Sequence, residues 1–161
     1  MDVAVDRARA VLEQEGKRIE HESRCAALAH EKATGSWRLV YLALGGPATG
    51  LAAAAGVSAL AHERVVAAVL ALSAAVASAL MTFLDPSGQV ADHRRAAGRY
   101  RAIENRARLF WQVASTSDTA AEGARQELAE LVDEWNKTIE GSPPLFERFR
   151  SYGRRAAGRE S

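Results

Sequence analysis

Residues 39–84 read LVYLALGGPATGLAAAAGVSAL, then AHER, then VVAAVLALSAAVASALMTFL. The first arm, 39–60, carries no ionisable side chain other than Tyr41, and the second arm, 65–84, carries none. Each arm is about twenty residues long, which is the length that an α-helix needs to cross the hydrocarbon core of a bilayer. The polar break between the arms is long enough to reverse the direction of the chain. The stretch therefore predicts a transmembrane helical hairpin.

The charge, the cysteine count and the N-terminal residues of the chain each exclude one feature. The 21 basic and 20 acidic side chains leave a formal net charge of +1, so we expect no binding to nucleic acid through charge. The single cysteine, Cys25, excludes an internal disulfide and fits a reducing compartment. Charged residues of both signs precede the first apolar arm, so we also expect no conventional N-terminal signal peptide.

Small residues recur at four-residue spacing along both arms. This spacing lets helix backbones approach closely in lipid, where burial of apolar surface does not drive association. It fits pairing of the two arms within one chain, and it also fits several hairpins gathered into a ring, which would make the protein a homo-oligomer. The positions predicted to pack membrane helices are Gly46, Gly50, Ala52, Gly56, Ala67, Ala71 and Ala75.

Aromatic and basic residues flank the two arms. Rings with a polar tip and long cationic side chains favour the membrane interface. The predicted interfacial or headgroup residues are Trp37, Arg38, Tyr41, Arg94, Arg95 and Arg99. A solvated helix face accounts equally well for the three later arginines. Because the break between the arms holds a single arginine, Arg64, and more basic residues flank the outer ends, we expect both termini in the cytoplasm. Many Ala and Arg and few Lys are typical of GC-rich bacteria, so the expected location is a bacterial inner membrane.

Outside the arms, the hydrophobic periodicity predicts charged helices and hence an all-α fold with a cytoplasmic helical bundle. The predicted organisation is an N-terminal cytoplasmic helix in 1–36, the transmembrane hairpin in 37–84 and a cytoplasmic helical region in 85–161. Whether the N-terminal helix continues into the first span stays open. Asp85 or Ser87 is expected to cap the helix that follows the second span.

One later helix, expected over residues 89–115, has a heptad pattern from Val90 to Ala114. A second amphipathic helix is expected over 122–140, and the aromatic and basic residues after 145 are expected to close the bundle. The alternative is that this last segment lies on the membrane. The predicted core positions of the cytoplasmic helices are Tyr100, Glu104, Trp111 and Trp135.

No constellation of catalytic or metal-binding residues stands out. The four histidines are scattered, and His62–Glu63 has no second histidine at the spacing of a zinc-binding helix. The glycines of 45–50 are not followed by the Lys–Ser/Thr of a phosphate-binding loop. We therefore expect no enzymatic activity, no catalytic residue, no metal and no cofactor. With no ionisable group inside either arm except a tyrosine, a secondary transporter is also not expected.

From the second arm onward the sequence resembles the SLATT family of two-transmembrane effectors. The motifs that carry the resemblance are Phe83–Leu84–Asp85–Pro86, His93–Arg94–Arg95–Ala96–Ala97, Tyr100 and Ile103–Glu104–Asn105–Arg106–Ala107–Arg108. The helix around 131–136, the break Ser142–Pro143–Pro144 and the aromatic–basic tail are also similar. The resemblance extends over roughly residues 26–156, so the chain would be a single SLATT-like domain.

The resemblance implies a membrane effector of bacterial antiviral defence. Such proteins are thought to oligomerise and to permeabilise or depolarise the inner membrane on an infection-linked signal, as in abortive infection. In related systems a nucleotidyltransferase encoded nearby makes a cyclic nucleotide as the signal, but no residue of this sequence supports direct nucleotide sensing. The expected partner, besides the lipid bilayer, is a sensor protein or the nucleotidyltransferase; the alternative is that the cytoplasmic bundle does the sensing itself. The alternatives are a non-permeabilising anchor or scaffold for a cytoplasmic partner, and a soluble bundle with the alanine-rich arms as its buried core.

Overall fold

The computed structural model describes the backbone of residues 2–116 and 121–159, and the side chains of residues 7–113 and 123–159. Within these ranges the structure is all-helical and contains no strand, which confirms the predicted all-α class. The helices are α1 (Asp2–Leu60), α2 (Arg64–Leu84), α3 (Pro86–Thr116), α4 (Ala121–Glu140) and α5 (Glu147–Ala157).

Helix α1 answers the question that the sequence left open, because it runs from Asp2 to Leu60 without a break. The segment around Gly35 is helical, and Pro47 lies inside the helix. A proline cannot donate a backbone hydrogen bond within a helix. Close to it, the Thr49 hydroxyl donates to the backbone oxygen of Gly45 at 3.0 Å.

The chain forms two compact units, whose borders cross helices rather than loops. The first unit consists of Met1–Ala33 and Asp92–Ser161, and the second of Thr34–Ala91. Helices α1 and α3 therefore each contribute residues to both units.

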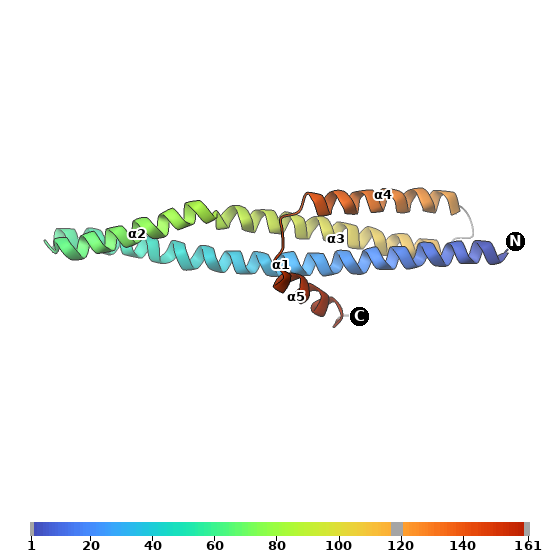
Figure 1. The fold of residues 1–161 in the computed structure, drawn as a ribbon, viewed down its shortest axis with the longest axis horizontal. Helices are drawn as coiled ribbons and strands as arrows, with labels where there is room; N and C mark the ends of the chain where they lie inside the picture. Colours follow the sequence, from blue (N-terminus) through green and yellow to red (C-terminus); the bar gives the residue numbers. More distant parts are fainter. Residues whose placement is uncertain (1, 117–120, 160–161) are drawn as a thin grey trace. The chain divides into compact units, whose positions relative to one another are not determined.

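Two apolar clusters hold the first unit together. The larger one forms where α1, α3 and α4 meet; it consists of Ile19, Ile103, Ala107 and Leu131, with Leu128, Val132 and Trp135 packed against it. The smaller one joins α5 to α1 through Ala29, Ala33 and Phe149, with Leu145 beside them. In Figure 1, α4 runs along α3, and α5 lies against α1.

The buried face of α3 follows the heptad pattern of its sequence. Of the positions of the pattern, His93, Ala97, Tyr100, Glu104 and Ala107 are buried and Val90 and Trp111 are half-buried. Ala96, Ile103 and Phe110, beside the pattern, are also buried. The side chain of Ala114, the last position of the pattern, lies outside the described residues. A 3.5-residue repeat keeps one stripe of a helix against its neighbours, so this pattern predicts that stripe but not the full width of the buried face.

The start of α3 is set by Asp85 and Pro86. Asp85 adopts a left-handed conformation with φ of 38°, which ends α2. Its carboxylate accepts hydrogen bonds from the Ser87 hydroxyl at 3.0 Å and from the backbone N–H of Gly88 at 3.1 Å. The expected cap is therefore Asp85, and the helix begins at Pro86, three residues before the predicted start. Proline is well suited to this first position because its missing N–H is not needed there.

In the second unit, α2 lies beside the last part of α1 (Figure 1). The turn between them contains His62 in a left-handed conformation with φ of 65°. Two described helices are long and apolar enough to span a membrane, and in their most apolar windows 11% and 6% of the residues are buried. The core helix of a soluble protein is mostly buried, so this exposure argues against the soluble-bundle alternative.

Candidate functional site

Alanines line the contact between α1 and α2 in the second unit. Ala48 and Ala55 of α1 and Ala74 of α2 are buried. A Cβ atom placed on Gly45 would lie 3.6 Å from Cε of Met81, which is ordinary van der Waals contact. The contact residues are three positions apart at Gly45 and Ala48 and seven apart at Ala48 and Ala55, which are spacings of one helix face.

The glycines predicted to pack membrane helices lie elsewhere on α1. A Cβ atom placed on Gly46, Gly50 or Gly56 would find nothing within 4 Å. Two positions separate Gly46 from Ala48, which is about 200° around a helix, so the GxxxG pair lies outside the buried contact with α2. Gly46 also lines a hollow with Ser78 and Met81 of α2. The remaining predicted packing positions are exposed at Ala52, Ala71 and Ala75 and half-buried at Ala67. Within one chain the structure therefore leaves the GxxxG pair Gly46 and Gly50 as an open surface.

The predicted interfacial residues are accessible in both units. Tyr41 and Arg38 are exposed and Trp37 is half-buried in the second unit. In the first unit, Arg94, Arg95 and Arg99 are exposed, and Arg95 pairs with Asp92 at 3.2 Å. Their exposure fits either of the two expected roles, at lipid headgroups or in solvent.

Glu104 lies in the core of the first unit and is 5% exposed. Its carboxylate pairs with Arg101 one turn earlier at 3.1 Å and with Arg24 of α1 at 3.9 Å. Arg101 also pairs with Glu31 of α1 at 3.2 Å. Because a buried carboxylate is costly unless it is paired, these contacts fix the register of α1 against α3.

The two tryptophans predicted for the core of the first unit are half-buried. Trp111 donates its indole N–H to Glu20 of α1 at 2.6 Å, and the ammonium of Lys17 lies 4.8 Å from the ring centroid. Trp135 packs against the larger apolar cluster, and the guanidinium of Arg18 lies 5.3 Å from its ring centroid. Both rings therefore tie α1 to a neighbouring helix at the edge of the core.

A pair of buried histidines joins α1 to α3. The Nδ1 atoms of His30 and His93 lie 2.9 Å apart, and the two side chains are 2% and 3% exposed. The Tyr100 ring stacks on His30 with the centroids 5.5 Å apart. A hydrogen bond between two Nδ1 atoms needs one donor and one acceptor, so the two imidazoles take opposite roles. Nothing in the sequence indicated this pair, because the two residues are 63 positions apart.

Burial of this histidine pair shifts its titration. Burial, and then the charge of His93, lower the pKa of His30 from 6.5 to about 4. Burial also lowers the pKa of His93, although the neighbouring Asp92 carboxylate acts in the opposite direction. Both imidazoles are therefore neutral near pH 7 in the folded chain.

This shift predicts a loss of stability in acid. The unfolded chain takes up protons below about pH 6.5 and the folded chain does not, so the stabilisation is complete above that pH and falls as the pH drops towards 4. For His30 the loss is roughly 3 kcal/mol. Urea unfolding, followed by tryptophan fluorescence at pH 7 and pH 4.5, measures it. The double variant His30→Asn, His93→Asn is the control, because it keeps the acid response of the carboxylates. Equal pH dependence in both proteins would contradict the prediction.

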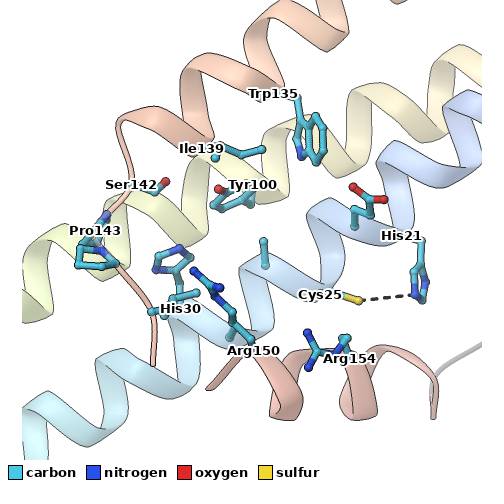
Figure 2. A pocket seen from close by; sticks show the side chains of 15 residues that line it. His21, Cys25, His30, Tyr100, Trp135, Ile139, Ser142, Pro143, Arg150 and Arg154 are labelled. Atoms are coloured by element: carbon cyan, nitrogen blue, oxygen red, sulfur yellow. Dashed lines mark hydrogen bonds between the residues drawn. The ribbon is translucent and has the colours of Figure 1, made fainter. Parts of the chain in front are cut away.

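A cavity of about 620 Å³ lies within the first unit, beside His30. Its walls come from α1, from Tyr100 of α3, from Trp135 and Ile139 of α4, from the segment between α4 and α5, and from α5 itself (Figure 2). Arg150 and Arg154 supply cationic groups from α5. Sequence reasoning missed the cavity, since residues of four helices and a connecting segment have to be brought together to form it.

The position of α5 on α1 is fixed by a close backbone approach at Gly153. A Cβ atom placed there would lie 2.1 Å from the backbone oxygen of Cys25 and 3.1 Å from Cβ of Ala29. Glycine is therefore required for this contact. Burial raises the pKa of the Cys25 thiol, whose Sγ lies 3.6 Å from Nε2 of His21.

In the part of the chain that the structure describes, no group of three or more His, Cys, Asp or Glu side chains is placed to hold a metal ion. The features available for function are thus the apolar helices with their open glycine face and the cavity of the first unit. Comparisons with protein-family models, with characterised proteins and with solved structures found no match.

Proposed function

We propose that this chain is a membrane effector that oligomerises and permeabilises or depolarises the bacterial inner membrane on an infection-linked signal. The last part of α1 and all of α2 cross the bilayer as a hairpin, and the charged helices stay on the cytoplasmic side with both termini. The outcome for the cell is growth arrest or death, as in abortive-infection antiviral defence.

The observation that carries this proposal is the apolar surface of the second unit. Large apolar side chains are exposed along both helices, among them Val65 at 78% and Phe83 at 86%. Soluble monomers rarely leave a contiguous apolar surface of this kind in water. A hydrocarbon environment removes the cost, because a helix hydrogen-bonds its backbone groups internally except at its ends and at the carbonyl one turn before Pro47.

The open glycine face supports oligomerisation. Gly46 and Gly50 lie outside the buried contact with α2, and a Cβ atom at either position would meet nothing within 4 Å. Small residues at this spacing let a helix of another chain come close. No ionisable side chain other than Tyr41 lies in the two spans, so a conduction path would run between subunits, lined by small side chains.

The link to antiviral defence rests on the resemblance to SLATT proteins, whose motifs run through α2 and α3. In this chain the activating signal comes from a sensor protein or a nucleotidyltransferase encoded nearby, and it acts on the first unit. The first unit has the contacts of an ordered helical bundle, with ion pairs between α3 and α4 such as Arg106 with Glu134 at 2.8 Å. Such a bundle can transmit a binding event to helices that continue beyond it.

The experiment that tests the proposal measures membrane potential in bacteria that express the chain from an inducible promoter, alone and with the neighbouring genes. A voltage-sensitive dye reports depolarisation, and a cell-impermeant DNA stain reports larger breaches. The expected result is depolarisation together with growth arrest. An unchanged potential under both conditions would contradict the proposal and favour a non-permeabilising anchor.

A further inference from the structure

We propose that the cavity of the first unit binds a small organic anion, with its negative group held by Arg150 and Arg154 and its apolar part against Tyr100, Ile139 and Pro143. This inference is independent of the proposed function, because the first unit would hold such a ligand whether or not the chain breaches a membrane. The cavity volume of about 620 Å³ lies in the range of small-molecule sites, which is roughly 300–1,000 Å³.

The charge at the cavity favours an anion. Arg150 lines the cavity and forms no ion pair with any other described residue. Arg154 also lines it, and its guanidinium pairs with Glu147 at 2.7 Å, which leaves further N–H donors available. The one acidic residue in the wall, Glu22, has its carboxylate bound by Arg18 at 2.9 Å. The lining is thus left with an uncompensated guanidinium. Figure 2 shows the Arg150 side chain extending from α5 toward His30 and the cavity.

The Tyr100 hydroxyl is a further polar group at the cavity. Tyr100 is 5% exposed, and its side chain is part of the cavity wall. The hydroxyl group forms no hydrogen bond with the other residues that the structure describes. The hydroxyl is not among the fully buried polar atoms without a partner, so it is open to the cavity that Tyr100 lines. An oxygen atom of a bound ligand would satisfy it.

The remaining wall selects a ligand with an apolar part. Ile139 and Pro143 present apolar surface, and Trp135 closes one side of the cavity (Figure 2). Apolar walls with a few placed polar groups are the usual composition of small-molecule sites. A ligand in this position would touch α5 on one side and α1 and α4 on the other, and so would hold α5 in place.

Binding is tested with the full-length chain in lipid nanodiscs by calorimetric titration, with empty nanodiscs as the blank. The probes are naphthoate and naphthyl phosphate, which share a flat apolar body and differ in the anionic group. Naphthamide is the neutral analogue. We expect at least one of the two anions to bind, and the tighter one identifies the group as carboxylate or phosphate. Naphthamide should bind about tenfold more weakly or worse.

Three variants locate the site. Arg150→Gln should weaken the binding of the anion about tenfold, and Tyr100→Phe, which keeps the ring, about fivefold. Arg155→Gln removes the same charge from an exposed α5 residue that is not part of the cavity wall, and should leave the affinity unchanged. The proposal is overturned if neither anion binds above the blank, if naphthamide binds as tightly as the anions, or if Arg155→Gln and Arg150→Gln have equal effects.

Discussion

Replacing both Gly46 and Gly50 by leucine is expected to abolish depolarisation in cells where the natural sequence causes it. The open face of α1 would then carry two bulky side chains, and the backbones of two chains could no longer approach closely. Because a Cβ atom at either glycine meets nothing within 4 Å, the folded chain itself should tolerate the change. The dye signal is expected to fall to the level of uninduced cells, with the helical content by circular dichroism preserved.

The matched control is Ala79→Leu in α2. Ala79 is exposed, and it lies on the side of α2 that carries the exposed Leu72 and Val76. One more leucine there adds apolar bulk toward lipid and should leave depolarisation intact. If the Gly46→Leu, Gly50→Leu variant still depolarises cells, chains do not associate through this face.

Gly153→Ala is expected to release α5 from α1. The added Cβ atom would lie 2.1 Å from the backbone oxygen of Cys25, and neither helix backbone can move away without separating the two helices. Undocking exposes Phe149 and Leu145 of the smaller apolar cluster, a loss of roughly 2 kcal/mol or more in spite of the better helix propensity of alanine. Tryptic cleavage at the arginines of α5 should therefore accelerate about thirtyfold.

Gly98→Ala is the control for this variant. Gly98 is an exposed residue of α3, and a Cβ atom placed there would have nothing within 4 Å. The substitution should leave cleavage of α5 unchanged and stabilise α3 by about 0.5–1 kcal/mol. Cleavage of the Gly153→Ala variant at the rate of the unchanged chain would show that the close approach of α5 to α1 is not formed in solution.

Periodicity and cap chemistry were sufficient to predict most of the helices. The heptad pattern of α3 predicted one stripe of its buried face, because that stripe repeats every 3.5 residues whatever lies opposite. The buried Ala96, Ile103 and Phe110 lie beside this stripe and were not predicted. Asp85 and Pro86 gave the junction between α2 and α3 through local backbone preferences. These features depend on residues close together in sequence, and a single chain shows them directly.

The side of α1 that packs on α2 was harder to predict. The first arm is made largely of alanine and glycine, so several of its faces carry small residues at suitable spacing. The face with Ala48 and Ala55 and the face with Gly46 and Gly50 are both candidates for the contact with α2. The structure selects the alanines for contact within the chain. To predict the His30–His93 pair and the cavity, one has to know how α1 is aligned along α3 and α5. No local sequence pattern contains this information.

That the two apolar helices cross a bilayer is tested most directly by cysteine accessibility in spheroplasts, with Cys25→Ser as the background. Glu63→Cys places a thiol in the turn between α1 and α2, and Glu127→Cys places one on an exposed face of α4. A membrane-impermeant maleimide is expected to label Glu63→Cys in intact spheroplasts and Glu127→Cys after lysis alone. Labelling of Glu127→Cys before lysis, or protection of Glu63→Cys until lysis, would contradict a hairpin that crosses the membrane with both termini in the cytoplasm.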